Sequence, residues 1–563
     1  MIAAGLRRLL PAWQRARSGI GGWSVTTWLI AALVALPILA VLAHAFVPAP
    51  EIWGHLTRTV LPRYLINTFI LALGVGALAL VVGVGSAWLV VMCRFPGRRI
   101  FEWALLLPLA VPTYVIAYAY TDFLQFTGPI QTALRAYFDW TRHDYWFPDI
   151  RSLGGAIVLL ALVLYPYIYV LTRASFLEQS ACVLEVGRTL GRTPTRLLFG
   201  VAMPLARPAI AGGTALVLME TLNEFGAVHF FGVDTFTTGI YRTWFGLGEP
   251  VAAAQLAASL LAFVILLVLA ERWSRGRARY FQTTSRYRDL PRFQLHGPRA
   301  ALATLACATP IAIGFLLPGG LLLGMSITDG DDLLGGRFLD LTTNSLTLAA
   351  VSAIVAVLLA LLLSYGVRLQ QSRSARLAAR IAAMGYAVPG AVIAVGILIP
   401  LSAVDRTLHA FFSEHFVIET GLILTGTMVA LVYAYVVRFL AVAYNAVEAS
   451  LEKVTPNMDA ASRTLGKTAG RTLRLIHAPM MRSSLLAAGL LVFVDVMKEL
   501  PATVILRPFN FDTLAIRAHQ LASDERLAEA STASLVIVAV GIVPVILLSR
   551  AMGRSRPGRR DAD

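Results

Sequence analysis

Apolar residues run along the chain in stretches of about 20, separated by shorter polar or basic segments. A helix of that length is long enough to cross the hydrocarbon core of a bilayer. The pattern therefore predicts an all-α polytopic membrane protein with about 12 spans. We expect them near residues 24–47, 64–92, 101–121, 152–173, 207–230, 251–271, 300–326, 345–367, 381–402, 419–441, 483–506 and 527–549.

The polar segments between the apolar stretches give the orientation and the domain organisation. Arginines cluster beside the stretches, as they do at the cytoplasmic ends of membrane helices. We therefore expect both termini, 1–23 and 550–563, in the cytoplasm. The basic segment 272–299 is the expected cytoplasmic linker between two six-span repeats, 24–271 and 300–549.

Composition and charge agree with a membrane location. Hydrophobic residues make up 57% of the 563 residues and charged residues only 14%, whereas soluble proteins have about a quarter charged residues. The formal net charge of +16 could indicate nucleic-acid binding in a soluble protein. Here the positive-inside pattern accounts for it, and we expect no nucleic-acid partner.

The two halves repeat one another in sequence. Ala110-Val111-Pro112 returns as Ala387-Val388-Pro389, and Asn67 returns as Asn344, both at an offset of 277. Further along, Arg188-Thr189-Leu190-Gly191 returns as Arg463-Thr464-Leu465-Gly466 at an offset of 275. The same offset pairs Thr238 with Thr513 and Arg242 with Arg517. Because each half has an even number of spans, the repeats are expected to be parallel.

Two long cytoplasmic segments, about 174–206 and 442–482, are the most informative part of the chain. Each is expected to contain two short helices joined at a glycine, Gly191 or Gly466, with a proline, Pro204 or Pro479, before the next span. Glycine permits the positive φ of a tight corner between helices. Proline is tolerated at the first turn of the helix that follows.

At these residues the sequence resembles the cytoplasmic signature of ABC importer permeases, whose coupling helices dock on an ATPase. Glu185, Gly191 and Pro204 match the family's Glu, Gly and Pro. In the second copy Ala460 stands where the glutamate belongs, and Asp459 precedes it. The coupling residues implied by the resemblance are Glu185, Arg188, Leu190, Gly191, Pro204, Asp459, Ala460, Arg463, Leu465, Gly466 and Pro479. A pair of cytoplasmic connectors without a partner is the alternative.

Charged residues also occur inside two predicted spans, the fifth and the eleventh. They are Glu220, Asn223 and Glu224 in one, and Asp495, Lys498 and Glu499 in the other. In each span the acids are four residues apart and so share a helix face. Ionised groups at the bilayer centre cost about 2.5–3.5 kcal/mol each and face a bundle interior or water. They line a pathway for a cation, or they make interhelical hydrogen bonds, with Lys498 neutralising Asp495.

Tyrosines recur in the third predicted span, at Tyr114, Tyr118 and Tyr120. We expect them in the interfacial aromatic belt or in packing rather than in contact with substrate.

The chain has no G-x-x-x-x-G-K-[ST] stretch, no His/Cys metal cluster and no nucleophile–base pair. We therefore expect a non-enzymatic subunit that binds no cofactor and no metal with high affinity. ATP-Mg would be bound by a partner ATPase.

Among ABC permeases, the fused two-unit arrangement most resembles the ferric-iron importers. The stretches that carry this resemblance are GAVHFFGVDTFTTGIYRTWF from Gly226 and VDVMKELPATVILRPFNFDTLAIRAH from Val494. The resemblance implies a type I importer fold in a bacterial inner membrane, an ATPase homodimer, a periplasmic binding protein and Fe³⁺ transport by alternating access. Thiamine, a polyamine or a phosphonate is an alternative cargo. A proton-coupled secondary transporter is the alternative from another class.

Overall fold

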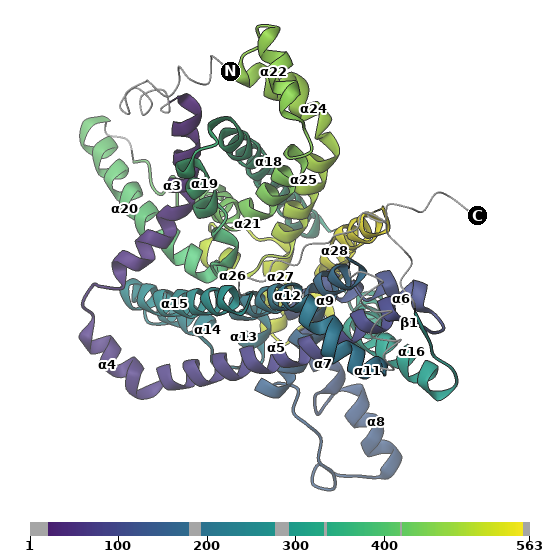
Figure 1. Cartoon of the computed structure of the whole chain (residues 1–563). Helices are drawn as coiled ribbons and strands as arrows, with labels where there is room; N and C mark the ends of the chain where they lie inside the picture. The colour runs from purple at the N-terminus through teal and green to yellow at the C-terminus, as the bar shows by residue number, and fades with distance from the viewer. Residues whose placement is uncertain (1–20, 179–192, 276–291, 331–334, 417–418, 555–563) are drawn as a thin grey trace. The chain divides into compact units, whose positions relative to one another are not determined.

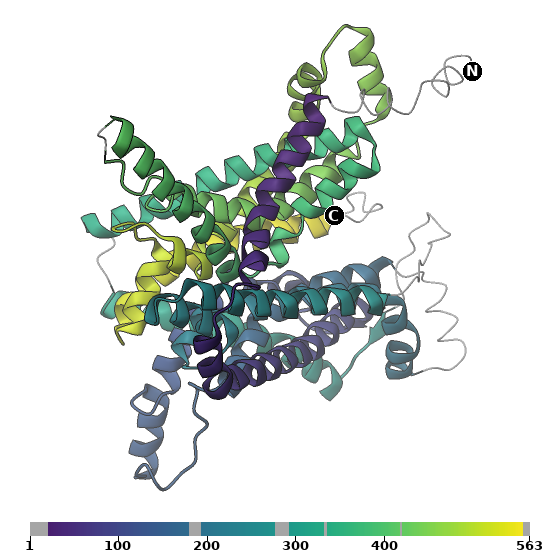
Figure 2. The same ribbon diagram turned by 90° about the vertical axis from the view of Figure 1, so that its left-hand side faces the viewer.

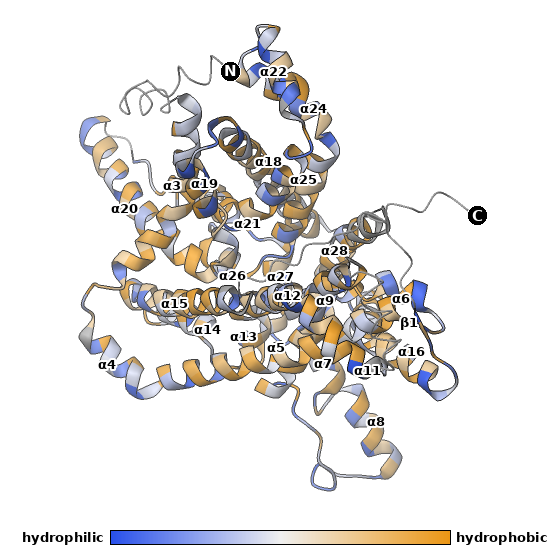
Figure 3. Cartoon of the chain, viewed as in Figure 1, coloured by the Kyte–Doolittle hydropathy of each residue, from blue (hydrophilic) through white to orange (hydrophobic). Residues whose placement is uncertain are grey.

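The computed structural model describes residues 21–178, 193–275, 292–330, 335–416 and 419–554. Over these ranges the chain is helical apart from loops and one short parallel pairing of β1 (Cys93–Arg94) with β2 (Phe293–Gln294). It has 10 helices long and apolar enough to cross a membrane, or up to 12 if two sharply bent helix pairs each count as one span. Apolar residues cover these helices (Figure 3). The prediction of an all-helical polytopic membrane protein is confirmed.

The two bent pairs mark where the structure departs from the predicted spans. The third predicted span is broken between Ala110 and Thr113 with a bend of 89°, and a bend of 80° between Met480 and Arg482 lies just before the eleventh. The eleventh predicted span, 483–506, is itself interrupted between Met497 and Pro501. In the third span, Val111 is extended because the residue before a proline disfavours the helical region, and Pro112 is extended as well. Val388 before Pro389 is extended in the same way, so α20 begins at Gly390. The ninth span predicted at 381–402 therefore starts later than expected.

The chain divides into two compact units. Unit 1 comprises residues 1–46, 345–496 and 505–511, and unit 2 comprises 47–344, 497–504 and 512–563. The boundary passes through α18 (Gly336–Gln370), α25 (Arg482–Met497) and α26 (Pro501–Leu506).

Unit 2 is organised around α5 (Leu61–Met92), α9 (Leu153–Glu178) and α12 (Met203–Asn223), which pack on one another (Figure 1). Two glycines allow the close approach, because a Cβ on Gly83 or on Gly213 would lie 2.8 Å from an atom of Ile168. Small residues serve this purpose in many membrane helix pairs. The other elements are α4 (Pro50–Thr59), α6 (Arg98–Ala104), η1 (Leu107–Ala110), α7 (Thr113–Leu124), α8 (Pro129–Phe138), α11 (Pro194–Leu197), η2 (Leu198–Ala202), α13 (Gly226–Phe230), α14 (Phe236–Tyr241), η3 (Arg242–Gly246), α15 (Pro250–Arg275), α16 (Pro298–Ile311), η4 (Ala312–Leu316), α17 (Leu317–Thr328), α27 (Leu514–Ser523) and α28 (Leu527–Arg554).

Unit 1 is built on α21 (Met428–Leu451), which contacts α20 (Gly390–Phe416), α19 (Arg373–Ala382) and the turn η5 (Gly385–Ala387). The η5 turn lies so close to α21 that a Cβ on Gly385 would meet the Val437 carbonyl oxygen at 1.8 Å. The remaining elements are α3 (Gly22–His44), α22 (Pro456–Thr464), α23 (Ala469–Thr472), η6 (Leu473–His477) and α24 (Ala478–Met480).

The units are not the two sequence halves, because unit 1 includes α3 from the first half and unit 2 includes α16–α17, α27 and α28 from the second half. Helix α3, from the first half, packs on α19 and α20 in unit 1, as both views show (Figures 1 and 2). The Tyr433 hydroxyl donates a hydrogen bond of 2.7 Å to the Leu33 carbonyl there. In unit 2, α16–α17 from the second half packs on α28 and α7, and the Tyr120 hydroxyl donates to the Ile313 carbonyl at 2.6 Å. The repeats 24–271 and 300–549 remain a prediction about duplication of the sequence. In the structure, helices of one repeat pack against helices of the other within each unit.

A polar contact made twice in unit 2 corrects part of the repeat register. The Asn67 amide donates to the Asp234 carbonyl at 2.9 Å, and the Asn344 amide donates to the Asp512 carbonyl at 3.2 Å. The next residues, Thr235 and Thr513, are the N-caps of α14 and α27. The offset here is thus 278, and the pairing of Thr238 with Thr513 at an offset of 275 is wrong.

Candidate functional site

The second predicted coupling loop is described in full. Helix α22 ends in a Schellman motif, in which the Gly466 N–H donates to Arg463 O at 3.0 Å and the Lys467 N–H donates to Ser462 O at 3.1 Å. Gly466 has φ +72°, the left-handed conformation that favours glycine. After this corner the Thr468 side chain caps α23 by accepting from the Arg471 N–H. The helix–corner–helix arrangement expected around Gly466 is what the structure shows.

The described part of the first loop repeats this arrangement element by element. Helix α11 and turn η2 correspond to α23 and η6 at the offset of 275, and Thr193 takes the place of Thr468. Pro204 lies in the first turn of α12, and Pro479 lies in the first turn of α24. The other predicted residues of this loop, Glu185, Arg188, Leu190 and Gly191, lie outside the described residues.

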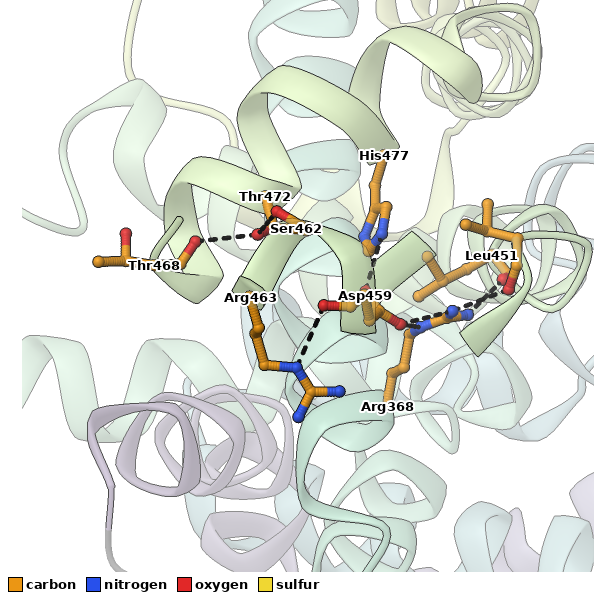
Figure 4. Close-up of polar contacts among 9 residues, drawn as sticks. Arg368, Leu451, Asp459, Ser462, Arg463, Thr468, Thr472 and His477 are labelled. Carbon is orange, nitrogen blue, oxygen red and sulfur yellow. Dashed lines mark hydrogen bonds and ion pairs between the residues drawn. The ribbon is translucent and has the colours of Figure 1, made fainter. Parts of the chain in front are cut away.

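Arg368, at the end of α18, binds the start of the second loop from inside unit 1 (Figure 4). Its Nε and Nη2 donate to Asp459 Oδ2 at 2.9 and 2.8 Å. Nη1 donates to the Leu451 carbonyl at 2.7 Å, and Nη2 also donates to the Val454 carbonyl at 2.8 Å. Charge-assisted hydrogen bonds from a planar guanidinium are strong and geometrically specific. One side chain therefore fixes α22 to the end of α21.

Two further contacts join α22 to the elements after the corner, one to α23 and one to η6 (Figure 4). His477 Nε2 lies 2.9 Å from Asp459 Oδ1, and the His477 side chain is fully buried. The Ser462 and Thr472 hydroxyls are 2.7 Å apart. Asp459 is thus enclosed by residues of its own unit, with 16% of its side chain exposed.

Other residues of α22 and of the rest of the loop are exposed. Ala460 and Arg463 are exposed, and four apolar side chains are exposed on the loop. They are Met458, Leu465, Leu475 and Met480, with Leu465 76% exposed. The position of the family's glutamate is therefore occupied by an exposed alanine, while the neighbouring carboxylate of Asp459 points to Arg368.

Two of the predicted intramembrane acids have equivalent structural roles in the two halves. Glu224 Oε1 accepts from the Ala227 N–H at 2.8 Å, and Glu499 Oε1 accepts from the Ala502 N–H at 3.0 Å. Each carboxylate thus caps the short helix that follows it, α13 or α26. Glu224 also accepts from the Thr113 hydroxyl of α7. The Thr113 contact joins two helices, as the hydrogen-bonding alternative expects, whereas the caps are local contacts. Both this alternative and the pathway role stay predictions.

The other predicted pathway residues lie on α12, on α25 or just after α25. Glu220 is half-buried on α12, and Asn223 is buried at its last residue. Asp495 is half-buried on α25, in unit 1, whereas Lys498 follows α25 and belongs to unit 2.

Sequence reasoning missed a cluster of rings in unit 2. The Tyr118 hydroxyl lies 2.8 Å from His519 Nδ1, and the His519 ring centroid lies 5.3 Å from that of His229. Burial lowers the pKa of His519 to about 3. Tyr114, Tyr118 and Tyr120 are all buried, so their rings pack inside the unit and do not form an interfacial belt. Only the long sequence separation hid the pairing of Tyr118 with His519.

Among the residues that the structure describes, no group of three or more His, Cys, Asp or Glu side chains could hold a metal ion. The arrangement instead consists of a structured loop with exposed apolar residues, and of two carboxylates at helix starts, of which Glu499 is buried and Glu224 is half-buried.

Residues 79–279 match the family described as the binding-protein-dependent transport system inner membrane component. The chain is a multi-pass inner-membrane permease of the ABC importer class, with the type I importer fold and two permease units fused in one polypeptide. Over 541 residues, 93% of this chain and 97% of the relative, it is 26% identical to the Fe(3+)-transport system permease protein FbpB 2 of Haemophilus influenzae.

Two other relatives place this similarity in context. The ferric transport system permease protein FbpB of Actinobacillus pleuropneumoniae is 22% identical over 79% of this chain and 64% of its own length. The molybdenum transport system permease protein ModB of Escherichia coli K12 is 29% identical over 35% of this chain and 87% of its own length. ModB has about the length of one predicted six-span repeat, and it matches about a third of this chain.

Proposed function

We propose that this permease imports ferric iron, delivered by a periplasmic binding protein and driven by a cytoplasmic ATPase homodimer. The similarity to an Fe(3+)-transport permease over nearly the full length of both chains carries the cargo assignment. The chain itself binds no ATP-Mg and no cofactor. Both termini lie in the cytoplasm, on the side of the ATPase.

The exposed residues of the second loop support docking of the ATPase. Met458, Ala460 and Leu465, on and just after α22, are exposed among polar residues, and Leu475 and Met480 are exposed further along the loop. Exposed apolar patches rimmed by polar residues are typical of protein–protein contacts. Movement of the ATPase would reach the membrane helices through Arg368, which connects α22 to α18 and to the end of α21. Alternating access would then follow from paired displacement of the two coupling loops.

The loops are not equivalent in this proposal. The first carries Glu185 at the family's glutamate position, whereas the second presents Ala460 and keeps Asp459 internal. A symmetric ATPase dimer would therefore make a charged contact with one loop and an apolar contact with the other.

The half-buried carboxylate of Glu224 and the buried carboxylate of Glu499 favour a cation over the oxyanions handled by some relatives, such as the molybdenum permease. A phosphonate is the second candidate cargo, because 31% of the chain is 29% identical to a putative 2-aminoethylphosphonate permease of Salmonella paratyphi A. Thiamine and polyamines are further cargoes to compare.

The test is uptake of radiolabelled ferric iron by proteoliposomes that contain the full chain, its ATPase and its binding protein. Uptake that requires ATP and stops with an ATPase-dead partner would support the proposal. Uptake of phosphonate, thiamine or putrescine in place of iron would retain the importer class and overturn the cargo. Transport without the ATPase would favour the proton-coupled alternative.

A further inference from the structure

Three elements from distant parts of the sequence meet beside the two capping acids. Gly226, at the start of α13, is so close to α7 and to the turn before α26 that a Cβ there would lie 2.6 Å from Tyr114 Cβ and 2.7 Å from Leu500 Cδ2. Glu224 precedes Gly226 by two residues, and Glu499 directly precedes Leu500. The two acids of the fifth and eleventh spans therefore lie near the same tyrosine in unit 2.

The Tyr114 hydroxyl is buried without a hydrogen-bond partner. The residue is 3% exposed, and its hydroxyl oxygen has no partner among the described residues. It lies within electrostatic range of both Glu224 and Glu499. An unsatisfied buried hydroxyl destabilises the fold by about 1–3 kcal/mol. Phenylalanine would fill the same space without that penalty, so the hydroxyl requires an explanation beyond folding.

We propose that the Tyr114 hydroxyl, with the carboxylates of Glu224 and Glu499, forms a transit site for a hard trivalent cation. The proposal rests on the proposed import of ferric iron and adds the residues that the ion meets. Phenol and carboxylate oxygens are hard donors, the type that oxygen-seeking cations select. The backbone N–H groups of Ala227 and Ala502 hold the carboxylates in place before the ion arrives.

Weak binding suits the role. Conduction requires a site that is favourable enough to enter and weak enough to leave. Two carboxylates supply two negative charges, and the tyrosine completes the oxygen set.

The test compares two substitutions on α7 that each remove one hydroxyl. Tyr114→Phe removes the hydroxyl without a partner, and Tyr120→Phe removes a hydroxyl that donates to the Ile313 carbonyl at 2.6 Å. We expect Tyr114→Phe to fold at least as well as the parent chain and to lower iron uptake about tenfold. Tyr120→Phe should lose some stability and keep transport. Thermal unfolding of the full chain in nanodiscs provides the first measurement and uptake into proteoliposomes the second.

Equilibrium binding of radiolabelled gallium(III), which is trivalent and redox-inert, separates this proposal from the cargo assignment. Gallium binding that weakens in Tyr114→Phe and not in Tyr120→Phe supports the site, even if the parent chain imports a cargo other than iron. Unchanged gallium binding in Tyr114→Phe overturns the site. If the parent chain imports iron and Tyr114→Phe imports it equally well, the transit role is overturned whatever the binding result.

Discussion

Glu224 and Glu499 occupy equivalent positions in the two repeats, and each accepts a hydrogen bond from the backbone N–H three residues ahead. The duplicated sequence thus reproduces a specific contact and not only a pattern of spans. A charged acceptor also explains how an N–H at the start of a short buried helix is satisfied. The same carboxylate can therefore cap a helix and supply negative charge.

The Glu499 cap predicts a stability loss on truncation. Glu499→Ala leaves the Ala502 and Thr503 N–H groups without the acceptors they have now. We expect a loss of about 1–3 kcal/mol, measured by thermal or denaturant unfolding of the purified chain. Glu51→Ala, at an exposed position of α4, is the control and should change stability little. A loss no larger than that of the control would show that the cap is dispensable.

Gly466 predicts a purely conformational effect. Its φ is positive and no atom lies within 4 Å of where a Cβ would be, so Gly466→Ala introduces strain without a clash. The left-handed conformation costs about 1–2 kcal/mol for a residue with a Cβ. Gly470→Ala is the control, because Gly470 has equal space and no positive φ.

The same corner predicts an effect on transport. We expect uncoupled transport with normal membrane insertion for Gly466→Val, alone or combined with Gly191→Val. Normal uptake in the double variant would contradict the role of the corner.

The Arg368–Asp459 contact predicts an interaction energy measurable by a double-mutant cycle. Single changes to Arg368→Ala and Asp459→Ala should each loosen α22, and the double change should cost less than their sum. We expect a coupling of about 0.5–3 kcal/mol, since the residues share one network. Protease cleavage in the 452–468 segment reports the local loosening. Additive effects would mean that the two side chains act independently.

Gly226 predicts that one methyl group disrupts the junction of α7, α13 and the turn before α26. The Cβ of Gly226→Ala would approach Tyr114 Cβ and Leu500 Cδ2 too closely, and overpacking of this kind costs about 1–3 kcal/mol. Gly85→Ala, in the middle of α5 with open space around it, is the matched control and should be neutral or stabilising. Equal stability of the two variants in thermal unfolding would mean that the junction accommodates the added methyl group by small shifts.

The spans and the duplication could be predicted from sequence because both depend on local signals. A run of apolar residues indicates a membrane helix, and the Ala-Val-Pro motif recurs at a fixed offset. The break at Pro112 was missed because the apolar run continues through it, whereas the conformational restriction acts on the residue before the proline.

The coupling loop was predicted from its glycine and prolines, but the contact that holds it was not. Arg368 and Asp459 are separated by 91 residues, and nothing in the spacing of either indicates the other. The same holds for Tyr118 and His519. Capping by Glu224 and Glu499 could have been suspected from the short apolar segments that follow each acid, because acids at helix starts are common.

The exchange of first helices has a consequence for biogenesis. Helix α3 is made early but packs on α19 and α20, which the ribosome completes more than 300 residues later. Neither unit can reach its final core until most of the polypeptide has been synthesised. Because both repeats are on one chain, each newly made α3 can pack on the α19 and α20 of the same polypeptide. The intervening chain keeps the local concentration of these helices high. Covalent fusion here acts as an assembly aid that removes the search for a second subunit.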